Sequence, residues 1–202
     1  MNIRITPGPL AGTVAPPPSK SQAHRVLIAA ALSGGFSVLK GLAQSQDIQA
    51  TAGCLRAMGA YPEELDGGDI RVHGLGSSIP QHREDWLVKF DCGESGSTLR
   101  FLIPVALAVL GGGIFSGRGR LMERPQRPYF DIFDEKGIFY KQKDGALTVR
   151  GELTPGEYRL PGNVSSQFVT GLLYALPLLD GDSQIVLTSP LESRGYVDMT
   201  LD

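Results

Sequence analysis

The sequence predicts an α/β (α+β) fold built from repeated β-α-β-α-β-β units, and three observations carry this prediction. A small polar cluster opens an apolar helical run three times, at residues 19–25, 94–100 and 160–167. Successive copies lie roughly 70 residues apart, a spacing typical of a structural repeat. Short strand-like and helix-like segments alternate between the copies. The 26 Gly and 14 Pro of the 202-residue chain provide the turns that many short elements need.

The first two repeats share one order of elements. In the first, the cluster SKSQAHR leads into an apolar helix, and a strand-like segment follows at 36–40. A helix is then expected at about 47–58 and a strand within 67–73. In the second, the cluster ESGSTLR leads into its helix, and the later elements are expected at 113–115 (strand), about 128–135 (helix) and 146–150 (strand).

The third repeat begins with a Pro-Gly-Asn turn before Ser165, Ser166 and Gln167. An apolar helix follows, then a strand at 183–187 and the start of a second helix at 196–201, where the sequence stops. A repeat broken off at this point leads us to expect that the chain is part of a longer protein.

Residues 1–18 differ in pattern from the three repeats that follow. Residues 1–6 alternate like a strand, and three consecutive prolines at 16–18 favour a stiff, extended link. We therefore expect residues 1–18 to be a strand and link that belong to another domain. Residues 19–202 then form the main domain of three repeats, at about 19–91, 92–160 and 161–202, with the third incomplete.

Composition excludes several classes of protein. A net charge of −2 with 42% hydrophobic residues is unlike a polybasic nucleic-acid binder. The apolar runs are too short to span a bilayer, and we see no signal peptide. Cys54 and Cys92 fit neither a metal-ligand pattern nor a disulfide framework. We expect a cytoplasmic protein that binds no nucleic acid, membrane or metal.

The polar clusters suggest anion binding. A helix start exposes unpaired backbone N–H groups and the positive end of the helix dipole, so it suits a phosphate or a carboxylate. Lys20, Ser21 and Arg25 would fall near one helix end and could hold one anion together. The simpler interpretations stay open: Ser165 could be only a helix cap, Lys20 could be solvated, and His24 could be structural or exposed.

Five motifs together resemble one family. They lie at residues 18–25 (PSKSQAHR), 92–100 (CGESGSTLR), 122–125 (MERP), 164–168 (VSSQF) and 193–196 (SRGY). In this order they resemble the N-terminal half of the 5-enolpyruvylshikimate-3-phosphate (EPSP) synthase family, the 3-phosphoshikimate 1-carboxyvinyltransferases, whose members are about twice as long. They cover nearly all of this chain.

The resemblance implies a fold and a reaction. The fold is an enolpyruvyl transferase-like, inside-out α/β barrel domain, here incomplete at its C-terminus. The reaction transfers the enolpyruvyl group of phosphoenolpyruvate to the 5-hydroxyl of shikimate 3-phosphate and releases phosphate, in the shikimate pathway of aromatic amino acid and chorismate biosynthesis. The family uses no metal or organic cofactor and is inhibited by glyphosate. The whole enzyme is expected to be a monomer, whereas an incomplete domain could self-associate through exposed apolar surface.

The resemblance also assigns roles to residues. Lys20 matches a catalytic residue that contacts both substrates, and the family's proton-transfer residues fall in the half that is absent here, so we expect the isolated chain to be inactive. Glu94, Ser97 and Arg100 lie in a matching motif, but their roles are left open. The remaining matches are Ser21, Arg25, Ser165, Ser166, Gln167, Ser193 and Tyr196 for shikimate 3-phosphate, and Gly96, Arg124 and Gln167 for phosphoenolpyruvate.

The chain departs from the family pattern in places. Glu94-Ser95-Gly96-Ser97 stands where many members have Asn-Ala-Gly-Thr, Phe101 where they have proline, and Met122 where lysine is common. Three alternatives therefore stay open. One is the UDP-N-acetylglucosamine enolpyruvyl transferase, although the reactive cysteine usual in its loop is missing from 117–124. The others are a non-catalytic phosphate-binding fragment and an RNA-modifying cyclase, which the low basic content disfavours.

Overall fold

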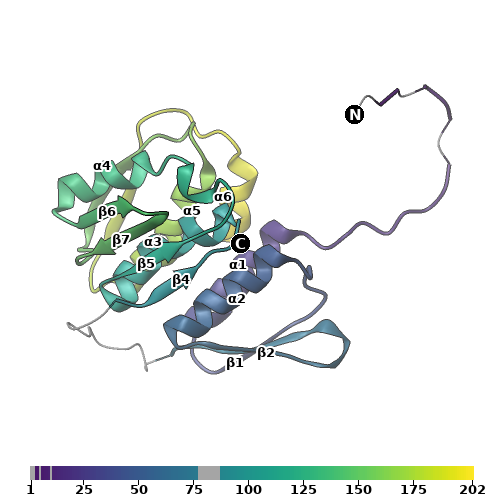
Figure 1. Cartoon of the computed structure of the whole chain (residues 1–202), viewed down its shortest axis with the longest axis horizontal. Helices are drawn as coiled ribbons and strands as arrows, with labels where there is room; N and C mark the ends of the chain where they lie inside the picture. The colour runs from purple at the N-terminus through teal and green to yellow at the C-terminus, as the bar shows by residue number, and fades with distance from the viewer. Residues whose placement is uncertain (1–2, 5, 10, 77–86) are drawn as a thin grey trace.

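The computed structural model describes residues 3–4, 6–9, 11–76 and 87–202. Short helices and strands follow one another from Lys20 to Leu201 (Figure 1). In chain order they are α1 (Lys20–Leu32), β1 (Phe36–Leu39), α2 (Gln46–Met58), β2 (Tyr61–Glu64), β3 (Ile70–His73), β4 (Lys89–Asp91), α3 (Gly96–Leu110), β5 (Gly112–Ser116), α4 (Arg127–Lys136), β6 (Phe139–Lys143), β7 (Ala146–Arg150), β8 (Gly156–Leu160), α5 (Ser166–Ala175), β9 (Ser183–Leu187) and α6 (Arg194–Leu201).

The predicted repeat is present. From β4 to β7 the elements run β-α-β-α-β-β; the first repeat follows the same order from α1 onward, and the third runs β8-α5-β9-α6. The predicted strand within 67–73 begins only at Ile70, because Gly67 and Gly68 adopt left-handed φ angles of 84° and 83°. Strand β8 had no counterpart in our reading of the sequence.

The strands of the described residues form three small sheets. Their orders are β1-β3-β2, β4-β5-β7-β6 and β8-β9. The first sheet is antiparallel, the second is mixed because β4 pairs with β5 in parallel, and β8 and β9 are parallel. These sheets do not close into a barrel.

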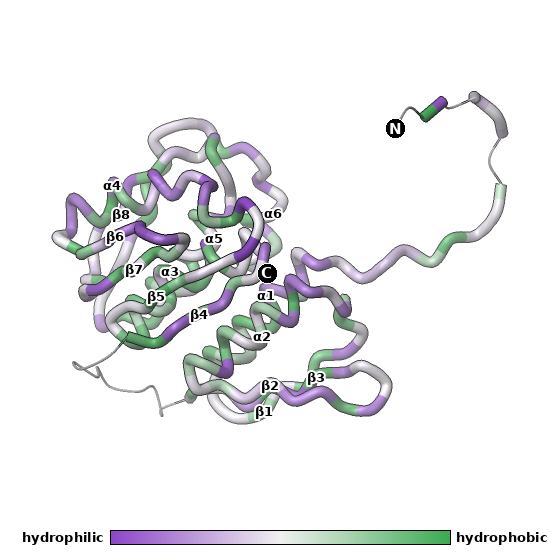
Figure 2. The backbone as a smooth tube through the Cα atoms, viewed as in Figure 1, coloured by the Kyte–Doolittle hydropathy of each residue, from purple (hydrophilic) through white to green (hydrophobic). Residues whose placement is uncertain are grey.

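Helices α3 and α5 occupy the interior, and the sheets lie outside. Helix α3 is apolar all round and buries Leu99, Leu102, Ile103 and Ala106 completely, as expected for a core helix. It packs against α5 and carries β5 on another side, while α1 and α2 lie against each other and support the first sheet (Figure 1). Hydrophobic residues gather along these interior helices, and hydrophilic residues dominate the outer strand β6 (Figure 2). The inside-out α/β arrangement is therefore confirmed.

Gly171 lets α3 and α5 approach closely. A Cβ built on it would lie 2.2 Å from Oη of Tyr129 and 2.5 Å from the carbonyl oxygen of Arg100. The single O–H of Tyr129 lies within hydrogen-bond distance of the carbonyls of Arg100 (2.7 Å) and Phe168 (3.1 Å), which share it as donor, and so joins α4 to both interior helices. This contact fixes the start of α5 beside the start of α3.

The strand predicted over residues 1–6 stays a prediction, because its partner strands are expected in another domain. Residues 1, 2 and 5 lie outside the described residues, and Ile3, Arg4 and Thr6 have no regular structure. No strand of the described chain pairs with Ile3, Arg4 or Thr6, and Ile3 is 75% exposed. The segment runs away from the body (Figure 1). Its assignment to another domain stays a prediction.

Candidate functional site

Four helices begin with a serine cap. The Oγ atoms of Ser19, Ser45, Ser95 and Ser165 accept hydrogen bonds from the backbone N–H groups of Gln22, Ile48, Thr98 and Gln167 at 3.2–3.3 Å. Each cap satisfies one N–H and leaves others at the same helix end available to a ligand. The caps start α1, α2, α3 and α5, and side-chain contacts link these four helix starts.

A first contact joins the starts of α3 and α5. The side-chain amide of Gln167 donates to Oγ of Ser97 at 2.9 Å and accepts from Nη1 of Arg100 at 2.7 Å. A Cβ on Gly96 would lie 2.9 Å from Nη1 of Arg124 and 3.7 Å from Oε1 of Gln167. The structure therefore brings together five residues that the sequence had nominated from three separate motifs.

The electrostatics of this cluster favour an anion. Arg100 also donates to the carbonyl of Pro125 at 3.3 Å, and its guanidinium lies over the ring of Phe168, 4.7 Å from the centroid. Burial lowers the pKa of Arg100, and the nearby Arg124 lowers it further. Among the described residues neither arginine has a carboxylate partner. Two guanidinium groups beside the positive end of α3 leave positive charge for a carboxylate or phosphate to neutralise.

The buried Nε of Arg100 has no hydrogen-bond partner within the described residues. Its other N–H groups donate to the side chain of Gln167 and the carbonyl of Pro125, so Arg100 holds these two residues in place. Arg124 is the exposed member of the pair and lies where a ligand can reach it. Arg100 therefore orients Gln167, whereas the Arg124 guanidinium is exposed to a ligand.

Arg25 is held tightly by the protein. Its side chain is 5% exposed and donates to Oγ1 of Thr200 (2.7 Å), the carbonyl of Ser21 (2.8 Å), Oγ1 of Thr170 (3.2 Å) and the carbonyl of Tyr196 (2.8 Å). Its guanidinium lies 5.2 Å and 5.8 Å from the ring centroids of Phe101 and Tyr196.

These contacts give Arg25 a structural role in addition to the ligand binding expected from the sequence. They join α1, α5 and α6, and burial lowers the pKa of Arg25. No carboxylate among the described residues balances its charge. Four of its five N–H donors are occupied, so a ligand would meet Arg25 through one remaining N–H and through its charge.

Lys20 lies at the start of α1, across from α2. Its Nζ is 3.0 Å from Oδ2 of Asp47, and its side chain is 57% exposed. The sequence did not predict Asp47 as a site residue, because acidic residues are common in the first turn of a helix, where they interact favourably with the helix dipole. The pair orients the Lys20 ammonium while leaving it accessible.

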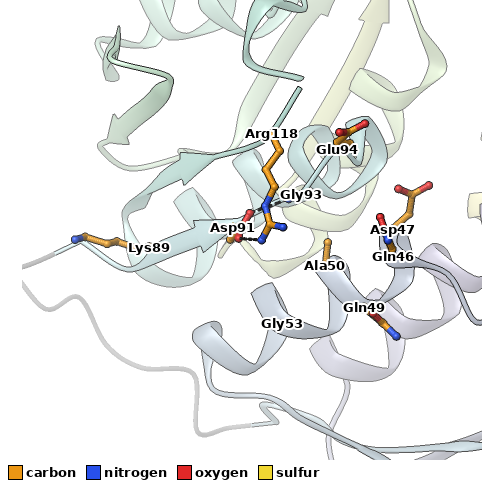
Figure 3. Close-up of a pocket in the computed structure, with 10 residues that line it drawn as sticks. All are labelled: Gln46, Asp47, Gln49, Ala50, Gly53, Lys89, Asp91, Gly93, Glu94 and Arg118. Atoms are coloured by element: carbon orange, nitrogen blue, oxygen red, sulfur yellow. Dashed lines mark hydrogen bonds and ion pairs between the residues drawn. The ribbon is translucent and has the colours of Figure 1, made fainter. Parts of the chain in front are cut away.

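Glu94 and Asp47 line a cavity of about 630 Å³ between α2 and the turn before α3 (Figure 3). On one side of it Arg118 pairs with Asp91 at 3.1 Å. The backbone N–H of Gly93 and, next, Arg118 lower the pKa of Asp91. A Cβ on Gly119 would lie 2.9 Å from Oε1 of Glu94, so the Glu94 carboxylate lies over the Gly119 turn. Among the described residues, Glu94 forms no ion pair with Arg100 or Arg124.

The remaining nominated residues lie at the starts of α5 and α6. Ser166 is buried, whereas Ser165 is partly exposed at its cap position. Ser193 precedes α6 with a left-handed φ of 58°, and Tyr196 is 47% exposed. Ser189, which the sequence did not single out, accepts from the N–H groups of Gly162 and Asn163 at 3.0 and 3.2 Å and so shapes the turn before α5.

Neither a cluster of metal ligands nor a membrane-spanning helix occurs among the described residues. Within the described residues no three His, Cys, Asp or Glu side chains gather as metal ligands. In the same part of the chain, every helix is too short or too polar to cross a bilayer.

Comparison with known proteins places this chain in a family. Residues 5–202 match the family model described as EPSP synthase (3-phosphoshikimate 1-carboxyvinyltransferase). The 3-phosphoshikimate 1-carboxyvinyltransferase of Clostridium beijerinckii is 48% identical over an alignment of 206 positions that covers 99% of this chain and 47% of that protein. The enzyme of the same name from Clostridioides difficile is 44% identical over 207 residues, with 99% and 47% covered.

The fold comparison agrees. The structure of an EPSP synthase from Acinetobacter baumannii aligns with a TM-score of 0.73 at 23% identity, covering 94% of this chain and 42% of that one. The chain spans about half the length of the curated relatives it matches. Together, the family match and the inside-out α/β fold establish that the chain belongs to the EPSP synthase family.

Proposed function

We propose that this chain is the shikimate-phosphate-binding half of an enzyme that transfers the enolpyruvyl group of phosphoenolpyruvate to the 5-hydroxyl of shikimate 3-phosphate. The observation that supports it most directly is the cluster of Gly96, Arg100, Arg124 and Gln167 at two adjacent helix starts. It offers the exposed Arg124 guanidinium to an anionic ligand and adds the charge of Arg100 behind Gln167, and neither arginine has a carboxylate partner among the described residues.

In this proposal phosphoenolpyruvate binds at the start of α3. Gly96 leaves room for a ligand beside Arg124, and Arg124 offers a planar fork to its carboxylate or phosphate. Gln167, held by Arg100 and Ser97, contacts both substrates from the α5 side. Lys20, oriented by Asp47, supplies a further positive charge between them.

Shikimate 3-phosphate binds at the starts of α1, α5 and α6. Ser165 and Ser166 offer hydroxyls and backbone N–H groups to its phosphate at the α5 start. Ser21 and Arg25 approach from α1, and Ser193 and Tyr196 from α6. Holding two anions side by side requires this concentration of positive charge, and it contributes to catalysis by positioning and electrostatic stabilisation.

The half-enzyme does not complete the reaction by itself in this proposal. Proton transfer to the enol carbon and elimination of phosphate need acid–base groups, and in this proposal most of them come from the second half of the site, with Lys20 contributed by this chain. We expect no phosphate release by this chain and full turnover when the second half of the site is supplied. The buried free thiols of Cys54 and Cys92 suit a cytoplasmic setting.

Isothermal titration calorimetry with two ligands and three variants tests the assignment. Arg124→Ala should weaken phosphoenolpyruvate binding by about 1–3 kcal/mol and spare shikimate 3-phosphate, and Ser166→Ala should do the reverse. Arg159→Ala is the matched control, because Arg159 is an exposed arginine on β8 that pairs with Glu157.

Three outcomes would contradict the proposal. One is equal affinity of all three variants and the parent chain for both ligands. Another is binding of UDP-N-acetylglucosamine in place of shikimate 3-phosphate, which would assign the sister transferase. Phosphate release by the isolated chain would refute the division of the site between two halves.

A further inference from the structure

A buried line of hydrogen bonds connects three helices beneath the proposed site. Nδ1 of His24 lies 2.8 Å from Oγ1 of Thr51, which lies 2.7 Å from Oγ1 of Thr98. Thr98 in turn lies 2.7 Å from Oγ of Ser95. The four residues are 3%, 0%, 0% and 3% exposed, so solvent does not reach them. They belong to α1, α2, α3 and the cap of α3.

The line also holds the backbone of α2. The carbonyl of Asp47 lies 3.2 Å from the Thr51 hydroxyl and 3.5 Å from that of Thr98. The Asp47 side chain carries the ion pair to Lys20 on the other side. At its other end the line reaches Ser95, which immediately precedes Gly96 and caps the N–H of Thr98 at 3.2 Å. Asp47, which pairs with Lys20, and Ser95, which precedes Gly96, therefore both contact the same buried hydroxyls.

We propose that Thr51 and Thr98 are positioning residues that set the spacing between the Lys20 ammonium and the anion pocket at Gly96 and Arg124. Neither threonine can touch a ligand, because both are completely buried. A satisfied buried network allows one arrangement of the elements that carry it, whereas an apolar contact allows small shifts. This inference rests on the proposed function, in which Lys20 and the Gly96 pocket hold parts of the same ligand pair.

Geometry explains why the spacing matters. Small displacements of charged groups from the productive arrangement lose much of the benefit of binding two reactants together. Burial lowers the pKa of His24 to about 4, so the ring is neutral at neutral pH and anchors the line without adding charge. The line therefore fixes position and leaves the local charge to Lys20, Arg100 and Arg124.

Conservative pairs of variants separate positioning from general stability. Thr98→Val and Thr51→Val keep the shape and remove the hydroxyl, whereas Thr98→Ser and Thr51→Ser keep the hydroxyl. The double variant Thr51→Val/Thr98→Val removes both central hydroxyls together. Val109→Ala is the stability control, because Val109 is buried on α3 far from the line.

Two readouts are measured on the complete 202-residue chain. The first is amide chemical shift and hydrogen exchange at Asp47, Gly96 and Ser97 without ligand. The second is affinity for phosphoenolpyruvate. We expect both valine variants to perturb all three amides and to weaken affinity about tenfold, the scale of one lost buried hydrogen bond. The serine variants should restore affinity to within about twofold of the parent chain.

The readouts distinguish two kinds of failure. Unperturbed amides with unchanged affinity in the valine variants would overturn the positioning role, as would equal amide changes in Val109→Ala. If the parent chain binds neither phosphoenolpyruvate nor shikimate 3-phosphate, the proposed function fails instead. The amides of Asp47 and Gly96 would then still decide whether the hydroxyls couple α2 to α3.

Discussion

His24 should make the fold sensitive to acid in a defined pH window. Burial lowers its pKa from 6.5 to about 4, while the unfolded chain keeps the ordinary value. The stability that neutral His24 contributes is complete above about pH 6.5 and is lost as pH falls toward 4, because only the unfolded state takes up the proton. Between about pH 7 and pH 4.5 the difference amounts to about 2.5 kcal/mol of unfolding free energy.

The measurement is urea unfolding of the parent chain and His24→Gln at both pH values. Glutamine can hydrogen-bond to Thr51 but does not titrate, and the other two histidines are common to both proteins. We expect the parent chain to lose about 2.5 kcal/mol more than the variant on acidification. Parallel losses would refute the reasoning, as would an NMR titration that places the His24 pKa near 6.5.

Four further substitutions test close approaches and buried hydrogen bonds. Gly171→Ala should lower the unfolding free energy by about 1–3 kcal/mol, since its Cβ would meet Tyr129 and the Arg100 carbonyl. Gly53→Ala in α2, where a Cβ meets nothing within 4 Å, should raise it by up to about 1 kcal/mol; equal effects in urea unfolding would argue against the helix contact. Tyr129→Phe should cost about 1–1.5 kcal/mol, because two buried carbonyls lose their shared donor, and an unchanged melting temperature would contradict this. Gly96→Ala should keep the fold, because the flexible Arg124 side chain can move, yet weaken phosphoenolpyruvate binding about tenfold; calorimetry showing full affinity would remove Gly96 from the site.

Local signals located most helices and strands. The helix predicted at about 47–58 is observed as Gln46–Met58, and the one at about 128–135 as Arg127–Lys136. These helices begin and end through residues that are near in sequence: Ser45 caps the first, and the left-handed Gly59 and Gly137 end them. The strand over 1–6 stays a prediction, because a strand needs a partner and the alternation of side chains does not show where that partner lies.

The sequence by itself indicated the repeated polar clusters, the Ser165 cap and the family motifs, because each cluster, cap or motif is formed by residues only a few positions apart. The site needed the tertiary structure. Arg25 meets Thr170, Tyr196 and Thr200 across 145–175 residues, and Gln167 meets Ser97 across 70. Which donor finds which acceptor over such separations depends on how the interior helices pack. Only that packing brought the hydroxyls of Thr51 and Thr98 together between the residues next to Lys20 and Gly96, which are Asp47 and Ser95.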